Sequence, residues 1–451
     1  MQARTELIRP EHLRLGPQGP ELFGEAAALV QAFALIEHVE HGRAKPRRDY
    51  QMDRLSLLLG HAQAHSPFWR ARLPAQAASI ADLPVLTRAE LRAQVEAEGA
   101  LPLPPDHGAP QKASTSGSTG ATLTLWCSAF NAAYNESRYS FDDVVGGRRL
   151  DLPLTYVAAK VSDVEELDRW PSRTGSVWRT GPATLAPILG EHLEAALALL
   201  LAGPGGHVVT RPAVVEALLG RVRDSGRAPP PFADIITFSE LVTAALREDV
   251  RTVLKARIAD RYSAEEVGPI AFECRRSVAH YHVASSNVLV EVVDERRRPV
   301  AEGKVGDLLL TGLASLASPI VRYDIGDRAA QIGRCPCGHD GPTLRGLLGR
   351  RRSLIRLPDG RLFFLRPTIF MMAPIAPVES WRAIQTGPVD LTFEVVAPRP
   401  LTDAEREGLA ALIRRLSSPA FVVTVGQVAA IDPGPGEKRQ LVVNLLDDPR
   451  G

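Results

Sequence analysis

The segment best suited to bind phosphate is Ala113–Gly120, with the sequence ASTSGSTG, in which every residue after Ala113 is Ser, Thr or Gly. Glycine lets the backbone approach a ligand closely, and hydroxyl and amide groups donate hydrogen bonds to phosphate oxygens. The segment is not a Walker loop, because no Gly-Lys-Ser or Gly-Lys-Thr ends it. It predicts a phosphate-binding loop, and a flexible polar connector is the alternative.

Two acidic segments and one lysine further along the chain could act on a bound phosphate. Glu265 and Glu266 lie in YSAEEVG, Asp327 ends RYDIGD, and Lys438 follows PGPGE. Only six residues are lysine, so Lys438 is a candidate for a task that arginine cannot perform. Each has a simpler interpretation: Glu265 and Glu266 could cap a helix or face solvent, Asp327 could be a turn residue, and Lys438 could be a solvated charge on a loop.

Three cysteines and a histidine could form a metal site. Cys335 and Cys337 are separated by a single proline, and Cys274 is followed by His280 and His282. Three thiolates and one imidazole make a tetrahedral Zn²⁺ ligand set. Ordinary buried thiols or a disulfide are the alternatives. Such a site would tie the segment after Glu266 to the loop after Asp327.

Composition limits the classes of protein to consider. At 451 residues the chain is long enough for two or three domains, and 53 basic against 52 acidic residues argue against a nucleic-acid partner. No apolar run reaches the roughly 18–20 residues needed to span a membrane, and the N-terminal residues lack the apolar core of a signal peptide. We therefore expect a cytoplasmic protein without a membrane partner. Four cysteines are too few for a disulfide scaffold, and Cys127 is expected to pack as a small hydrophobe.

The expected elements indicate an α/β fold of mixed sheets with flanking helices. Apolar residues at helical spacing predict helices at 25–39, at 52–65 and within 188–224. Helices that alternate with short apolar runs are typical of a layered α/β fold, and the later runs suggest an antiparallel portion near 288–323. The runs lie at 155–160, 207–210, 233–238, 288–293, 305–311 and 319–323.

The last hundred residues have the pattern of a separate small α+β domain. Gly349–Arg352 is the predicted boundary, which divides the chain into a large domain, 1–348, and a small one, 349–451. Arg350 could equally belong to a solvated basic edge. The expected small-domain elements are a hairpin at 353–364, a helix at 402–416 and strands at 391–397, 421–431 and 440–446.

The segments above, taken in order, resemble the motifs of the adenylate-forming superfamily. TSGSTG resembles its phosphate loop, YSAEEVG its YGxTExG segment, RYDIGD its YRTGD segment, Gly349-Arg350 the start of GRxDDxIK, and GEKR the terminal GK motif. Upstream, HAQAHSPFWRARL and LPVLTRAELR are similar to phenylacetate–coenzyme A ligases. The resemblance covers about residues 50 to 445. It implies a large adenylation domain followed by a small domain that rotates between two half-reactions.

The resemblance also implies a reaction and a set of roles. A small, aromatic carboxylic acid would react with ATP and Mg²⁺ to give an acyl-adenylate, which coenzyme A would then accept. The β- and γ-phosphates would be held by Thr115, Ser116, Ser118 and Thr119, with Gly117 and Gly120. Tyr262 and Arg350 would contact the nucleotide, and Glu266 would hold Mg²⁺. Asp327 would accept hydrogen bonds from the ribose hydroxyls, and Lys438 would approach the bridging oxygen.

Several points stay open at this stage. The acceptor could instead be a carrier protein or an amine in natural-product biosynthesis, the chain could be a non-catalytic nucleotide-binding relative, and a homodimer is compatible with the resemblance. Relatives of phenylacetate ligases carry a similar Cys and His group, which favours His282 over His280 in a structural Zn²⁺ site. The chain departs from the family pattern at Ala121, Glu265, Arg352, Ser353 and Glu437.

Overall fold

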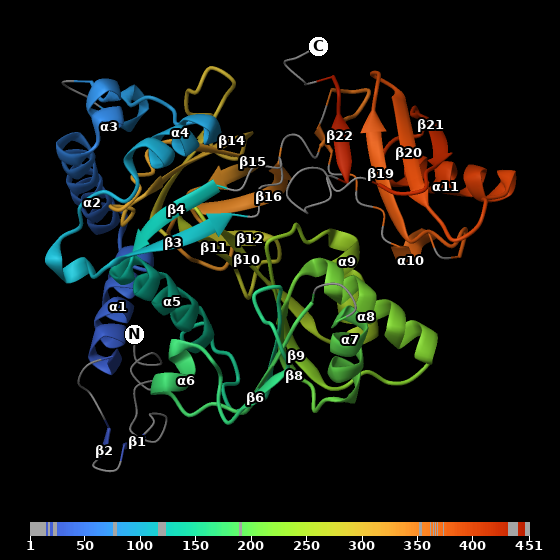
Figure 1. The fold of residues 1–451 in the computed structure, drawn as a ribbon, viewed down its shortest axis with the longest axis horizontal. Helices are drawn as coiled ribbons and strands as arrows, with labels where there is room; N and C mark the ends of the chain where they lie inside the picture. The colour runs from blue at the N-terminus through green and yellow to red at the C-terminus, as the bar shows by residue number, and fades with distance from the viewer. Residues whose placement is uncertain are drawn as a thin grey trace.

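The structure is a computed structural model of the 451-residue chain. It describes residues 15–16, 19–20, 25–74, 79–115, 123–188, 192–350, 354–360, 362–363, 365, 367, 369–372, 374–431 and 441–446. Two layered units are visible, a large one that extends to Arg350 and a small C-terminal one (Figure 1).

A twelve-stranded sheet forms the frame of the large unit, in the order β13-β14-β15-β16-β12-β11-β10-β9-β8-β5-β7-β6. Strands β7, β5, β8, β9 and β10 are parallel, whereas the pairs from β10 to β13 are antiparallel. The predicted mixed α/β class is therefore confirmed, with a larger antiparallel part than expected. The strands are Leu154–Val157 (β5), Glu165–Leu167 (β6), Ala183–Ala186 (β7), Gly206–Thr210 (β8), Phe232–Phe238 (β9), Arg257–Ala264 (β10), Gly268–Glu273 (β11), His280–Val283 (β12), Val288–Val293 (β13), Val305–Gly312 (β14), Tyr323–Ile332 (β15) and Thr343–Arg350 (β16).

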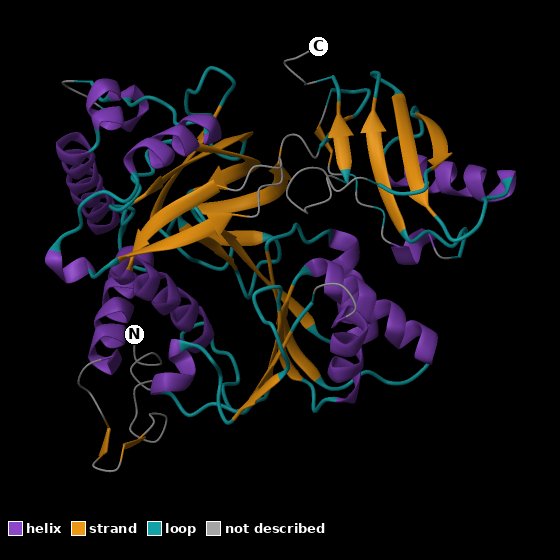
Figure 2. Ribbon diagram, in the orientation of Figure 1, coloured by secondary structure: helices purple, strands orange, loops and turns teal. Residues whose placement is uncertain are grey.

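Helices cover one face of the parallel strands (Figure 2). They are α7 (His192–Ala202), α8 (Pro212–Ser225), α9 (Ala244–Asp249) and the π-helical turn Val250–Leu254. Proline at the first position of α8 has no N–H to satisfy, and Gly226 ends the helix with φ +61°. The other face carries Val209, Ile236 and Ala259, packed with the buried Trp170.

The antiparallel strands pack against the N-terminal helices and a two-stranded hairpin. Leu58, Trp69 and Leu91 from three of these helices share one core with Leu123 and Tyr323. The elements are the short strands Leu15–Gly16 (β1) and Gly19–Pro20 (β2), helices Glu25–Glu40 (α1), Ala44–His65 (α2), Pro67–Arg72 (α3), Arg88–Glu98 (α4), Ala129–Val144 (α5) and Arg173–Val177 (α6), the 3₁₀ turns Ile80–Asp82 and Pro105–His107, and the hairpin strands Pro110–Thr115 (β3) and Leu123–Ser128 (β4).

The C-terminal unit has a core of its own, built around Trp381, Phe393, Leu409 and Ile413. Its four-stranded sheet has the order β21-β20-β19-β22, and α10 contacts α8 of the large unit. Thr402 and Glu405 form a capping box at the start of α11. The elements are Ile355–Arg356 (β17), Leu362–Phe363 (β18), Ile369–Met372 (α10), Ser380–Gln385 (β19), Asp390–Val396 (β20), Asp403–Leu416 (α11), Val422–Gln427 (β21) and Val442–Asn444 (β22).

Most of the expected elements are present, with two informative differences. Helix α2 begins at Ala44 rather than at 52, because Pro46 is tolerated in a first helical turn and Arg47, though charged, is buried with its guanidinium bonded to backbone carbonyls. The run 319–323 is not a strand: Arg322 has φ +46°, and β15 begins only at Tyr323. Among the described residues, no helix combines the length and the apolar character required to cross a membrane.

Candidate functional site

Two distant segments of the sheet meet through a pair of crossing hydrogen bonds. Tyr262 Oη, on β10, donates to Asp327 Oδ2 at 2.7 Å, and Tyr323 Oη, at the start of β15, donates to Glu266 Oε1 at 3.1 Å. Each segment therefore supplies the tyrosine that holds the acid of the other. The register of β10 against β11 shifts between Tyr262 and Ser263, an irregularity of the kind that re-aims side chains. The structure thus brings together Tyr262, Glu266 and Asp327, which the sequence pattern singled out.

Glu266 also has a cationic partner that the sequence did not reveal. Arg88 Nη1 lies 2.9 Å from Glu266 Oε1, and the Glu266 side chain is only 7% exposed. Arg88 is the first residue of α4, so the capping box of Thr87 and Glu90 fixes where its side chain begins. Burial, followed by the charge of Glu266, raises the pKa of Tyr323, which keeps its hydroxyl a donor at neutral pH. In the sequence, Arg88 was singled out only as part of LPVLTRAELR, a segment similar to phenylacetate–coenzyme A ligases.

The neighbouring acid, Glu265, behaves differently. Its side chain is 45% exposed, and its Oε1 lies 3.3 Å from Lys160 Nζ, an exposed ammonium in the loop after β5. The negative charge that Glu265 adds where the family pattern has threonine is therefore paired at the surface rather than beside Glu266. An exposed pair of this kind contributes little to stability.

The base of the predicted phosphate loop lies in the same core as this site. Thr115 and Leu123 are backbone partners at the ends of β3 and β4, and Leu123 packs in the cluster that holds Val267 and Tyr323. The backbone of Arg350 pairs with that of Asp327 on β15 and β16. Ser116, Gly117, Ser118, Thr119, Gly120 and Lys438 lie outside the described residues, as do Arg352, Ser353 and the side chains of Thr115 and Arg350.

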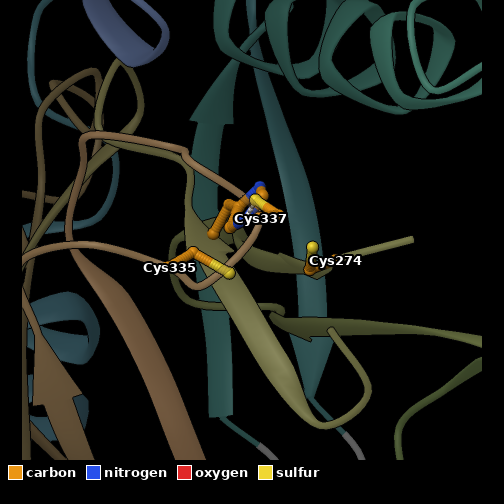
Figure 3. A group of neighbouring side chains, drawn as sticks. Cys274, Cys335 and Cys337 are labelled. Carbon is orange, nitrogen blue, oxygen red and sulfur yellow. Dashed lines mark hydrogen bonds between the residues drawn. The ribbon is translucent and has the colours of Figure 1, made fainter. Parts of the chain in front are cut away.

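The four proposed zinc ligands form a second cluster. The Sγ atoms of Cys274, Cys335 and Cys337 and a ring nitrogen of His282 all lie within 4.8 Å of one another. Figure 3 shows Cys335 and Cys337 on one loop and Cys274 on a separate segment, and Cys337 Sγ is 3.4 Å from His282 Nε2. A tetrahedral Zn–S site with bonds of about 2.3 Å needs sulfurs roughly 3.8 Å apart, so a small inward movement would suffice. Of the two candidate histidines, it is His282 that joins the cluster.

The surroundings of the cluster fit a thiolate-bound metal. The backbone N–H groups of Arg276 and His339 donate to the sulfurs of Cys274 and Cys337, each at 3.4 Å. The ring of His339 stacks on His282 with centroids 4.0 Å apart, which fixes the plane of the ligand imidazole. Burial, reinforced by the nearby His280, lowers the pKa of His282 to about 4, so the ring is in the neutral form that binds metals.

Comparisons with solved structures define the class of the fold. A 2-hydroxyisobutyryl-CoA ligase bound to 2-hydroxyisobutyryl-AMP superposes with a TM-score of 0.66 at 17% identity, covering 90% of this chain and 91% of that one. An anthranilate-CoA ligase bound to anthranoyl-AMP gives a TM-score of 0.52 at 13% identity over 73% and 64% of the two chains. The chain has the fold of adenylate-forming CoA ligases, as the motif order predicted.

A sequence relative narrows the resemblance. The chain is 28% identical over 178 residues to the phenylacetate–coenzyme A ligase of Thermus thermophilus, a stretch of 38% of this chain and 40% of that enzyme. The chain thus matches less than half the length of this curated relative. It matches no profile of a known protein family. The predicted similarity to phenylacetate–coenzyme A ligases is confirmed.

Proposed function

We propose that the protein activates a small, aromatic carboxylic acid with ATP and transfers the acyl group from the resulting adenylate to coenzyme A. Solved relatives with this fold are CoA ligases that hold acyl-AMP, and the sequence relative is a phenylacetate–coenzyme A ligase. The observation that carries the proposal is the crossing pair of hydrogen bonds, from Tyr262 to Asp327 and from Tyr323 to Glu266. It gathers the two acids that a Mg²⁺–nucleotide site requires.

Glu266 is suited to hold Mg²⁺ beside the phosphates. Arg88 and Tyr323 both contact its Oε1, and its Oε2 accepts no hydrogen bond from the described residues. A carboxylate oxygen is the ligand that Mg²⁺ prefers, and when bound the ion neutralises charge on the phosphate oxygens. The guanidinium of Arg88 pairs with this carboxylate and adds a cation near phosphates whose loop has Ala121 instead of a lysine.

Asp327 is suited to orient the ribose. An ionised carboxylate can only accept hydrogen bonds, and two vicinal hydroxyl groups offer two donors. Tyr262 holds Asp327 Oδ2 in one orientation. The backbone of Asp327 pairs with that of Arg350, which is the last residue of β16. Residues 349–451 would then form the small domain that brings Lys438 to the reacting oxygens.

The reaction requires the groups in two successive steps. A carboxylate oxygen of the acid attacks the α-phosphorus of ATP, pyrophosphate leaves, and Lys438 stabilises the charge on the bridging oxygen. The thiol sulfur of coenzyme A then attacks the acyl carbonyl carbon and AMP leaves, with the thiol proton passing to solvent. Thr115, Ser116, Ser118 and Thr119 would hold the β- and γ-phosphates during the first step.

We also propose that Cys274, His282, Cys335 and Cys337 bind a structural Zn²⁺. All four positions are taken by side chains of the protein, which leaves no ligand position for a substrate. The role is mechanical: the site joins the end of β11 to the segment that follows β15.

A pyrophosphate-release screen over aromatic and aliphatic acids tests the proposed function. We expect acid-dependent release from ATP and, when coenzyme A is added, an acyl-CoA thioester detectable by mass spectrometry. Parallel reactions with amines and with carrier proteins test the acceptor. Release of pyrophosphate without thioester formation would contradict coenzyme A as acceptor, and silence with every acid would contradict adenylation itself.

A further inference from the structure

An arginine stands at the point where the order of the parallel strands reverses. From β5 the chain passes to β7 on one side and then to β8, β9 and β10 on the other. Ligands of open parallel sheets bind outside the carboxyl ends of the strands at such a reversal. Arg211 directly follows β8, in extended conformation, with φ −85° and ψ 149°.

The strand register places Arg211 on the same face as two aromatic residues. Tyr156 of β5 pairs with Val209, and Val209 pairs with Ile236. Side chains alternate along a strand, so Arg211 and Phe238, two residues beyond Val209 and Ile236, point to the face that Tyr156 occupies. The rings of Tyr156 and Phe238 stack with centroids 6.4 Å apart and planes at 6°. Burial raises the pKa of Tyr156, and the nearby charge of Arg211 opposes that shift.

Arg211 has no counter-ion in the part of the chain that the structure describes. Its side chain is partly buried, and its Nε is shielded from solvent without a hydrogen-bond acceptor. Acidic side chains in this part of the fold have other partners. Asp142 and Asp143 pair with Arg261, and Glu265 pairs with Lys160. Glu240 accepts a hydrogen bond from the backbone N–H of Ala213. A shielded guanidinium nitrogen without an acceptor is unfavourable, so an acceptor from a ligand would relieve it.

We propose that Arg211 binds a second carboxylate on the acid substrate, so that the enzyme activates a dicarboxylic acid whose body lies against Tyr156 and Phe238. The inference rests on the proposed function and specifies its substrate class. Guanidinium and carboxylate match in a bidentate geometry, and the stacked rings offer an apolar surface to the part of the substrate between its two carboxylates. The first carboxylate remains the one that forms the adenylate.

Matched acids test the proposal in the first half-reaction, without coenzyme A. Phenylacetate is compared with 4-(carboxymethyl)benzoate, and butyrate with succinate, by kcat/KM for pyrophosphate release at saturating Mg²⁺–ATP. We expect the wild type to prefer at least one dicarboxylate over its partner. Arg211→Gln should lower that preference about 10- to 100-fold, chiefly through KM, and Arg211→Lys should restore part of it. Arg227→Gln removes the same charge from an exposed position just beyond the other end of α8 and should leave the preference as it is.

The possible results distinguish failure of this inference from failure of the proposed function. Turnover of the monocarboxylates with no preference for either dicarboxylate, or an Arg211→Gln preference within twofold of wild type, would overturn the inference while adenylation stands. If Arg211→Gln left the first half-reaction unchanged and raised only the KM for coenzyme A in the complete reaction, the residue would belong to the coenzyme A site and the inference would be overturned. Silence with all four acids would overturn both claims. Thermal unfolding of each variant shows whether a loss reflects misfolding, and the wild-type preference needs no variant.

Discussion

The large sheet carries two clusters of polar side chains at the two ends of the same strands. Glu266 lies just before β11 and Cys274 just after it; Asp327 lies in the first half of β15 and Cys335 follows its end. At one end the groups are oxygens held by tyrosines and Arg88. At the other they are three sulfurs and one neutral imidazole.

The two clusters differ in what they need from outside the chain. In the oxygen cluster, Arg88 offsets the charge of Glu266 and each tyrosine donates to one acid, so both carboxylates have partners from the protein. In the sulfur cluster, burial and the adjacent Cys335 and Cys274 raise the pKa of Cys337 to about 12, so its thiol stays protonated until a metal cation displaces the proton. We therefore expect metal loss to reduce stability, and changes in the oxygen cluster to reduce catalysis with the fold intact.

The largest expected effect is the loss of zinc. The purified protein should contain one Zn²⁺ per chain, and Cys337→Ser should remove it. Loss of a ligand held at 1,000 times its Kd costs about 4 kcal/mol, which for a chain of 451 residues lowers the Tm by roughly 4 °C. Metal analysis and calorimetry measure the two quantities.

The matched control for this prediction is Cys127→Ser, which alters a free cysteine on β4 outside the cluster. It should keep the metal and nearly all of the thermal stability. Less than a tenth of an equivalent of zinc in the wild-type protein would refute the site and, with it, the contrast between the clusters.

The second effect is catalytic. Lys438→Ala should slow pyrophosphate release by about 100- to 1,000-fold, the range found when one group that stabilises a developing charge is removed. ATP binding and the Tm should change little, because the residue belongs to the predicted small domain rather than to either cluster. Rapid-quench measurement of the first turnover tests this. A near-normal burst of pyrophosphate would show that another cation does this work, with Arg88 the next residue to change.

The motifs predicted the members of both clusters, but not what surrounds them. Tyr262, Glu266 and Asp327 were assigned from the resemblance of their segments to family motifs. Cys274, Cys335 and Cys337 were assigned from residue type, and the resemblance favoured His282. The structure brings the members of each group together. A neighbour contributed from far along the chain has no local pattern. Arg88 is 178 residues from Glu266, and only the packing of α4 on the sheet brings the two together.

The positions of strands could also be predicted from local sequence, whereas their order in the sheet could not. Short apolar runs predicted β8, β9, β13 and β14 because their apolar residues are buried between layers. This pattern failed at 319–323, since burial there does not require extended backbone and Arg322 takes φ +46°. The reversal of strand order beside Arg211 is a property of pairing between strands, which no single run of residues encodes.

The third prediction compares two adjacent acids. Glu266→Gln should raise the Mg²⁺ concentration needed for half-maximal pyrophosphate release about 10-fold, because an amide oxygen is a weaker ligand for a hard cation than a carboxylate. It should also leave Arg88 without its acidic partner. Glu265→Gln is the matched control, since that side chain is exposed and pairs with Lys160. Equal Mg²⁺ titrations for both variants would remove Glu266 from the metal site.

The smallest effects separate the two tyrosines of the oxygen cluster. Tyr262→Phe removes the donor to Asp327, and a hydrogen bond to a charged group of about 1 kcal/mol or more corresponds to a rise of at least roughly fivefold in the KM for ATP. Tyr323→Phe removes the donor to Glu266, which still has Arg88, so the Mg²⁺ titration should shift by a few-fold at most and the KM for ATP should stay close to wild type. Steady-state kinetics with ATP and Mg²⁺ varied independently resolve the two. If both variants changed both parameters equally, the crossing bonds would act as one structural tie, and the division into a ribose-binding acid and a metal-binding acid would fail.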